Sequence, residues 1–141
     1  MVRQALVDTA AFALSRGADF ELFADEPVFV QGDRNALSVL ARNLADNAVR
    51  YSPPGSRIEL RVAIEEGAAT LQVDDAGPGI PPGDRERVFD RFYRRAEHEE
   101  SGTGLGLAIV RGVAQQHGAT VTLGDSPLGG LRATVRFEAA A

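Results

Sequence analysis

The chain has 141 residues, 44% of them hydrophobic, which suffices for one domain with a core and is too short for two. Its formal charge of −5 argues against nucleic acid or an anionic membrane surface as a partner. It has no cysteine and all its basic residues are arginine, which excludes thiol catalysis, disulfides, cysteine-bound zinc, a Walker-A lysine and a Schiff-base lysine.

The first half of the chain alternates between helix and strand signals. Apolar positions at helical spacing predict a helix over residues 2–16. Short strands are expected at 20–23 and 28–31. Asp33 then offers an N-cap for a helix that runs to about residue 51, where "SPPG" stops it.

The second half predicts a sheet that is interrupted by one long loop. Alternating runs at 57–64 and 69–75, joined by "EEG", indicate a hairpin. The polar, glycine-flanked segment at about 81–103 is too long for an ordinary connection, and we expect a functional lid that is mobile without ligand. The remaining expected elements are a helix at about 103–116, ended by Gly118, and strands at 119–124 and 131–137.

Two asparagines on the predicted helix at 33–51 need an explanation, because asparagine is a poor helix former. On a helical wheel, Asn43, Asn47 and Arg50 lie along one edge of the apolar face. Amide oxygens can join a Mg²⁺ shell, amide nitrogens can donate to phosphate, and arginine can fork onto phosphate. The cluster suits a metal-bound nucleoside triphosphate, whereas a solvated helix flank is the simpler alternative for either asparagine alone.

Asp75 ends a strand whose other residues on that face are apolar, so alternation directs its carboxylate toward the core side of the sheet. A buried carboxylate needs partners. One hypothesis is a structural hydrogen bond to the following turn, "AGPG". The other is an acceptor for an amino group, such as that of adenine, which would enter over Gly77 and Gly79.

Gly102, Gly104 and Gly106 open the predicted helix at about 103–116. Bare N–H groups at a helix N-terminus can bind phosphate. The spacing differs from the dinucleotide fingerprint, and no lysine completes a P-loop. Close helix packing is the structural alternative for these glycines.

Taken together and in this order, these segments resemble the ATP-binding catalytic domain of sensor histidine kinases, in the Bergerat (GHKL) superfamily. Residues 43–51 are similar to that family's N box, 75–80 to its G1 box, 88–94 to its F box and 102–107 to its G2 box. The likeness covers roughly residues 20–137. It implies an α/β (α+β) two-layer sandwich, in which helices cover one face of a mixed, mostly antiparallel sheet.

The same resemblance implies ATP and Mg²⁺ as cofactors and assigns roles to individual residues. Asn47 would hold Mg²⁺, while Asn43 and Arg50 would contact the phosphates or the metal during catalysis. Tyr51 would pack near the ribose and base, and Asp75 would accept the adenine amino group. The other nucleotide-binding residues implied are Gly77, Gly79, Ile80, Arg94, Gly102, Thr103, Gly104, Leu105, Gly106 and Leu107.

Asn43 also separates this chain from relatives that hydrolyse ATP. Type II topoisomerases, mismatch-repair ATPases and heat-shock chaperones resemble this segment but place a glutamate four residues before the metal-binding asparagine, where it activates a nucleophile. Asparagine lacks that basicity, so this domain would position ATP and leave the nucleophile to a partner.

That partner would be a phosphoacceptor histidine on a separate helical hairpin. Neither His98, in the polar lid, nor His117, in the last turn of a helix, fits that role. We therefore expect residues 1–18 to be a trimmed helical lead-in and residues 19–141 to be the catalytic domain of a longer sensor. The isolated chain would be monomeric and would not phosphorylate itself.

The resemblance further implies a homodimeric parent in the inner membrane, with this domain in the cytoplasm and a response regulator downstream. Two other functions stay open on the sequence. A degenerate kinase could sense a nucleotide and signal through lid closure without phosphoryl transfer. An ATPase is the third possibility, which Asn43 disfavours.

Overall fold

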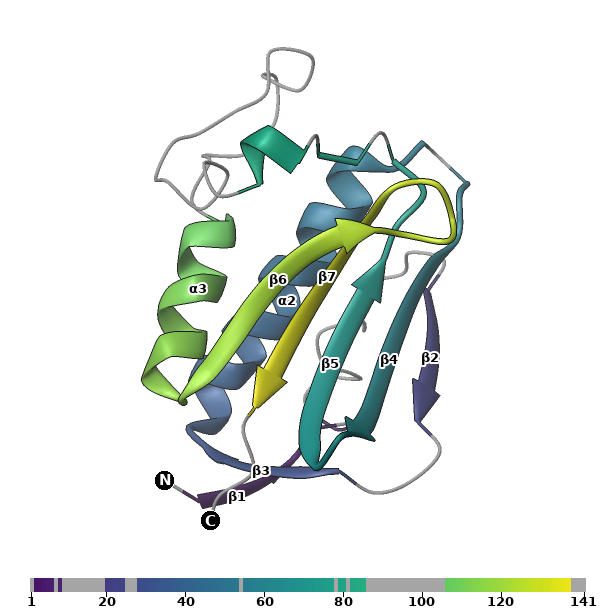
Figure 1. Cartoon of the computed structure of the whole chain (residues 1–141). Coiled ribbons are helices and arrows are strands. Elements are labelled where there is room, and N and C mark those ends of the chain that lie inside the picture. The colour runs from purple at the N-terminus through teal and green to yellow at the C-terminus, as the bar shows by residue number, and fades with distance from the viewer. Residues whose placement is uncertain are drawn as a thin grey trace.

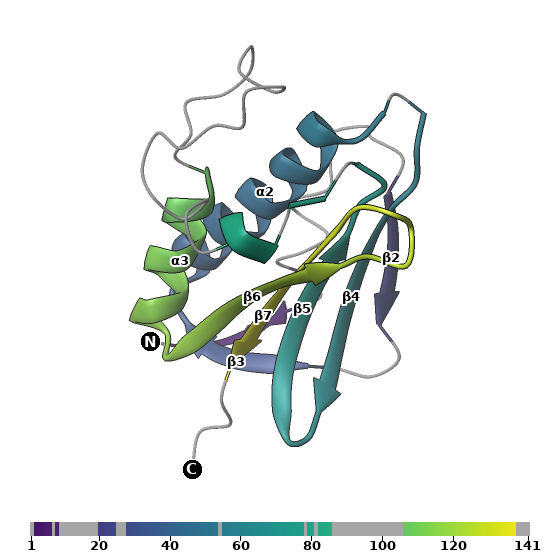
Figure 2. The ribbon, with the colours of Figure 1, turned by 45° about the horizontal axis from the view of Figure 1, so that its top comes forward.

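A mixed five-stranded sheet is covered on one face by two helices, α2 and α3, that lie side by side (Figures 1 and 2). The computed structural model describes residues 2–6, 8, 20–24, 28–53, 55–77, 79–80, 82–85 and 106–137. The elements in chain order are β1 (Val2–Ala5), β2 (Phe20–Ala24), β3 (Phe29–Gly32), α2 (Arg34–Tyr51), β4 (Ile58–Glu65), β5 (Ala68–Asp74), the 3₁₀ helix η1 (Pro82–Asp84), α3 (Gly106–Gln116), β6 (Ala119–Asp125) and β7 (Leu131–Phe137).

The strand order in the sheet is β2-β4-β5-β7-β6. β2 pairs in parallel with β4, and every other neighbouring pair of this sheet is antiparallel. The two layers and the mixed sheet confirm the predicted α+β sandwich. The α2 helix crosses over between the parallel strands, which is the connection that parallel neighbours require.

Local sequence explains why α2 begins and ends where it does. The Asp33 side chain accepts hydrogen bonds from the backbone N–H groups of Asn35 (2.9 Å) and Ala36 (3.3 Å), so two unpaired donors of the first turn are capped. Ser52 takes the C-cap, with its N–H bonded to Ala48 O at 3.1 Å. The predicted helix is confirmed at both ends.

The core lies between the helix pair and the inner face of the sheet. Period-2 alternation along the strands and the 3.6-residue period of α2 bring their apolar residues to this layer. Burial of these side chains is the main driving force for the fold. The largest fully buried side chains are Leu6, Val28, Leu37, Leu40, Leu60, Val62, Leu71, Val110 and Val135.

The predicted hairpin forms between β4 and β5, with Glu66 and Gly67 at its tip. Both residues have positive φ, 51° and 79°, as a two-residue turn matched to the twist of the strands requires. Gly118 follows α3 with φ 65°, which confirms its predicted place after the helix end.

The predicted helix over residues 2–16 is wrong at its start. Val2–Ala5 form β1, which pairs antiparallel with β3, and the Leu6 N–H donates to Val28 O at 2.8 Å. Pairing with a partner far along the chain outweighs a local helical pattern, which carries no information on that partner. The proposed division of the chain at residue 18 stays a prediction.

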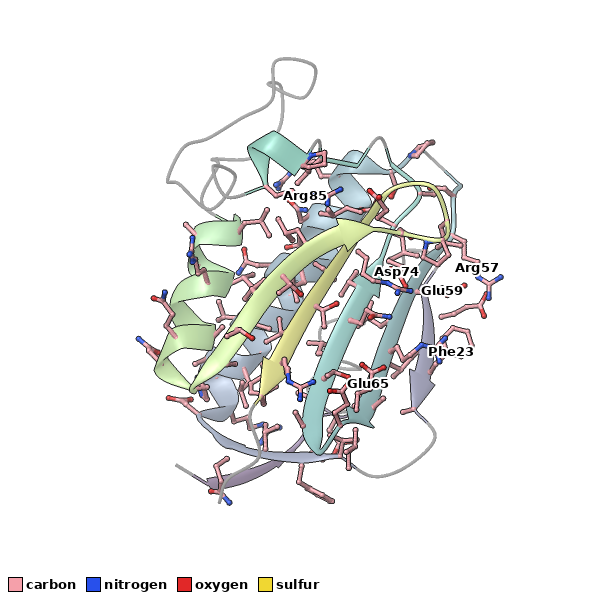
Figure 3. The ribbon with its side chains drawn as sticks, in the orientation of Figure 1. Phe23, Arg57, Glu59, Glu65, Asp74 and Arg85 are labelled. Carbon is pink, nitrogen blue, oxygen red and sulfur yellow. The ribbon has the colours of Figure 1, made fainter. Side chains whose placement is uncertain are left out.

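The open face of the sheet carries paired charges. Arg57 contacts Glu21 (2.7 Å) and Glu59 (3.0 Å), which ties β2 to β4 (Figure 3). Arg132 makes a two-pronged contact with Asp74, at 2.8 and 3.1 Å, across β5 and β7. Of the helices that the structure describes, none has the length and apolar character to cross a membrane.

Candidate functional site

Asn43, Asn47 and Arg50 lie on the edge of α2, as the helical wheel predicts. The two asparagines are half-buried and Arg50 is exposed. The Asn43 amide nitrogen donates to the Val39 carbonyl at 2.8 Å. The amide oxygen of Asn43, Oδ1, takes no part in this hydrogen bond.

The group that Asn43 meets is the first turn of α3. A Cβ atom built on Gly106 would lie 3.4 Å from Asn43 Oδ1. Glycine thus keeps the space beside this oxygen open, which a larger side chain would narrow. Two motifs far apart in sequence are brought together here, at the N-terminal end of α3.

Leu107, the next predicted site residue, is buried in the core. Its side chain packs α3 against the sheet. The Tyr51 backbone ends α2, while its side chain lies outside the described residues. The other predicted contacts outside the described residues are Arg94, Gly102, Thr103, Gly104 and Leu105, together with most of the lid predicted at 81–103.

Asp75 follows β5 directly and is only 4% exposed, as the strand alternation predicts. Its Oδ1 accepts hydrogen bonds from the backbone N–H groups of Gly77 (3.0 Å) and Leu131 (2.9 Å). The structural hypothesis of a bond to the following turn is thereby confirmed. Among the described residues, no donor bonds to its second oxygen, Oδ2.

Burial raises the pKa of the Asp75 carboxyl above its ordinary value. The N–H groups of Leu131 and Gly77 lower the pKa in opposition, and the negative charge of Asp74 raises it further. The ionised form is thus held by two backbone dipoles against a cost of desolvation. A donor that bonded to Oδ2 would stabilise the same ionised form.

The turn between β6 and β7 packs directly against Asp75, a contact that the sequence does not predict. The Asp75 N–H donates to Leu131 O at 3.0 Å, and the Gly130 N–H donates to Asp75 O at 3.2 Å. A Cβ atom on Gly130 would lie 2.1 Å from Asp75 Oδ1 and 2.5 Å from Gly77 N. No side chain fits at that position, so Gly130 is required for this approach. In the sequence, Gly129 and Gly130 indicate a turn, but they do not indicate that Asp75 packs against it.

The turn after Asp75 contains the remaining predicted glycines. Gly77 is buried, and Gly79 has φ 74°, a conformation that glycine adopts without strain. Ile80 ends this turn and packs on the core while its carbonyl accepts from Arg85 at 2.9 Å. Gly77 thus presents its backbone N–H, and no side chain, to the Asp75 carboxylate.

His117 joins the other ends of the two helices. Its Nε2 accepts from the Asp33 N–H at 3.1 Å, and its Nδ1 lies 2.8 Å from the Val113 carbonyl, to which it donates in this tautomer. The contact with Val113 fits the expected role at a helix C-terminus. Both ring nitrogens are engaged in helix packing, away from Asp75.

Within the described residues, no group of three or more histidine, aspartate or glutamate side chains could hold a metal ion. The ligands predicted along the α2 edge are the amide oxygens of Asn43 and Asn47, and the exposed Asp46 lies between these two residues in the sequence. Such neutral oxygens can complete a Mg²⁺ shell but supply no charge to it.

Residues 32–141 match the family described as "Histidine kinase-, DNA gyrase B-, and HSP90-like ATPase". The chain belongs to this family. Among solved structures, this domain is similar to the mycobacterial sensor histidine kinase MprB, with 32% identity and a TM-score of 0.88. That match covers 96% of this chain and 97% of the MprB chain.

Two further relatives place the domain among sensor histidine kinases. It is 28% identical to the ATP-binding domain of PrrB from Mycobacterium tuberculosis, with a TM-score of 0.80 over 99% of this chain and 98% of that one. It is 44% identical over 135 residues to the sensor histidine kinase CpxA of Escherichia coli (strain K12), a match to 92% of this chain. The chain spans 29% of the length of CpxA. The domain is thus homologous to the catalytic, ATP-binding part of these kinases, which favours the kinase hypothesis over a degenerate module.

Proposed function

We propose that this domain binds Mg-ATP beside α2, the start of α3 and the turn after β5, and presents the γ-phosphate to a histidine on a separate helical hairpin of the same sensor kinase. The observation that carries this proposal is the close approach of α2 to the start of α3: Asn43 Oδ1 lies 3.4 Å from the point where a Cβ atom on Gly106 would stand. This approach brings the Asn43 amide to the N-terminal end of α3, and the N–H groups of a helix N-terminus attract phosphate.

The adenine end of the ligand is assigned to Asp75. Among the described residues no donor bonds to its Oδ2, and the adenine amino group is a donor that fits an ionised carboxylate. Guanine carries a carbonyl at the equivalent position, so its oxygen would face a negative charge. We therefore expect adenine nucleotides to bind more tightly than guanine nucleotides.

The phosphate end is assigned to the α2 edge. Asn47 would supply a neutral oxygen to Mg²⁺, and Arg50 and Asn43 would contact phosphate oxygens or the metal. The triphosphate itself would supply further anionic oxygens to the metal. When bound, Mg²⁺ would neutralise negative charge on the phosphates during transfer.

The nucleophile comes from outside this chain. Asn43 has no basicity with which to activate water, which separates positioning of ATP from the reaction itself. The histidine hairpin would bring its ring nitrogen to the phosphorus atom, and such positioning is worth about 7–11 kcal/mol of barrier. We propose a response regulator as the downstream partner and a cytoplasmic position for this domain in a homodimeric, membrane-anchored parent.

Two measurements test this proposal. Calorimetry with Mg-ATP, Mg-ADP and Mg-GTP should give binding of the adenine nucleotides and weaker binding of GTP. With radiolabelled ATP, the chain alone should stay unlabelled and hydrolyse ATP near background, whereas added helical hairpin from the parent should become labelled on its histidine.

Each outcome selects one function. Labelling of the hairpin, abolished by Asn47→Ala, supports the kinase. Nucleotide binding without any labelling of the hairpin supports the degenerate sensing module instead. Brisk hydrolysis by the isolated chain would show that the role given to Asn43 is wrong and would favour the ATPase.

A further inference from the structure

Arg85 bridges two segments that flank the turn after Asp75. Its Nε donates to Ile80 O at 2.9 Å, and its Nη2 lies 2.7 Å from Asp125 Oδ1. Ile80 ends the turn, and Asp125 ends β6. Arg85 itself directly follows η1 and lies near the end of β6 (Figure 3).

The two ends of this turn are anchored on the same hairpin. At one end, Asp75 bonds to Gly130 and Leu131 through its backbone and its carboxylate. At the other end, the guanidinium of Arg85 links the Ile80 carbonyl to Asp125 at the start of the hairpin turn. The Ser126 N–H donates to Gly130 O at 2.8 Å, and the Gly130 N–H donates to Asp75 O, so backbone hydrogen bonds connect the residue after Asp125 to Asp75.

The turn needs such anchors because glycine imposes little conformational preference of its own. Gly77 and Gly79 lie between the two anchored ends, and the position of a Cβ on Gly79 is 3.5 Å from Gly130 O. A guanidinium can serve both acceptors at once through its fixed fork of donors, which a lysine ammonium cannot reproduce. The side chain of Arg85 is 23% exposed, whereas that of Asp125 is 90% exposed.

We propose that Arg85 is a positioning residue that holds the turn at 75–80 in the conformation that receives the adenine base, so that it sets nucleotide affinity without touching the nucleotide. This inference rests on the proposed function. It assigns a role to a residue that lies outside the asparagine, aspartate and glycine motifs. It also makes the β6–β7 hairpin, through Asp125, part of the base-binding structure.

The experiment is calorimetry of the chain with Mg-ADP and Mg-ATP. Arg85→Gln should weaken both affinities about three- to tenfold, as expected for one lost hydrogen bond. The factor should be the same for both nucleotides, because they share the base. Arg85→Lys should fail to restore affinity, since it keeps the charge near Asp125 but not the second donor to Ile80. Asp125→Ala should give a smaller loss, about two- to threefold.

The matched control is Arg61→Gln, which removes a charge of the same kind from the open face, where Arg61 lies 4.9 Å from the Phe23 ring centroid. Its affinity should equal that of the wild type. Thermal unfolding of each variant checks that the fold is kept, and Asp125→Ala decides the matter if Arg85→Gln fails to fold.

Three results would overturn the inference. Affinity of Arg85→Gln within the error of the wild type would remove the positioning role. A larger loss for ATP than for ADP would place Arg85 at the phosphates instead of the base turn. If the wild-type chain binds no adenine nucleotide at all, the proposed function itself fails, and this inference falls with it.

Discussion

Replacement of Asp75 by asparagine is the sharpest test of the base-binding assignment. The two side chains have the same shape, and an amide oxygen at the Oδ1 position can still accept from Gly77 N and Leu131 N. The amide nitrogen then occupies the Oδ2 position. The reversed orientation would place the NH₂ group against those two N–H donors, so it is excluded by repulsion.

The expected loss follows from that geometry. The adenine amino group, a donor, would face another donor in place of an ionised oxygen. A hydrogen bond to a charged group contributes about 1.5–3 kcal/mol. Asp75→Asn should therefore weaken Mg-ATP and Mg-ADP about 10- to 150-fold, and the preference over GTP should shrink because guanine presents an acceptor.

Calorimetry with the three nucleotides measures these changes directly. Asp74→Asn is the matched control, since it removes the same charge one residue away, from a side chain that pairs with Arg132 on the open face. That variant should keep its nucleotide affinity even if it loses stability. Unchanged ATP affinity in Asp75→Asn, or equal binding of ATP and GTP by the wild type, would refute the assignment.

Three further predictions follow from the site. Burial raises the pKa of the Asp75 carboxyl in the folded state, so folding favours its protonated form. The contribution of this group to the free energy of unfolding is fully present below its ordinary pKa of 3.8 and is lost as pH rises through the raised pKa. The stability of ligand-free Asp75→Asn relative to the wild type should therefore increase with pH across that window, as chemical denaturation at several pH values can measure; a flat difference would contradict it. Asn47→Ala should weaken Mg-ATP about tenfold and make the remaining affinity insensitive to EDTA, whereas Asn35→Ala in the first turn of the same helix should change neither. Gly130→Ala should lower the free energy of unfolding by about 1–3 kcal/mol and impair nucleotide binding, because its methyl group would overlap Asp75 Oδ1, while Gly124→Ala, with nothing within 4 Å, should do neither.

The parts of the fold that the sequence predicts well are those that short-range chemistry decides. The start of α2 depends on the Asp33 cap two and three residues before its partners, and the β4–β5 hairpin depends on two residues at its tip. The burial of Asp75 follows from simple alternation along β5. Each of these can be judged within a few residues of sequence.

The parts that the sequence does not predict depend on partners far along the chain. β1 forms by pairing with β3, and the sequence of Val2–Ala5 does not indicate that this partner strand is available. The same limit applies to Gly130, which contacts Asp75. The hydrogen bond between Asp75 and the neighbouring Leu131 spans 56 positions of the sequence. Arg85 is similarly indistinguishable, in the sequence, from the other arginines of its segment until Ile80 and Asp125 are seen on either side of it.

Of the residues proposed to contact ATP, those that the structure describes lie on α2, the turn after β5 and the start of α3, and each segment carries a recognisable local pattern. Asp75, the proposed base acceptor, is instead held by the β6–β7 hairpin, which contributes backbone groups and one exposed carboxylate. Under the proposed function, a site assembled in this way would hold the nucleotide while Asn43 supplies no base to activate water. Phosphoryl transfer would then depend on when the histidine hairpin reaches the γ-phosphate, so that control of this encounter would control the kinase without any change in how ATP is bound.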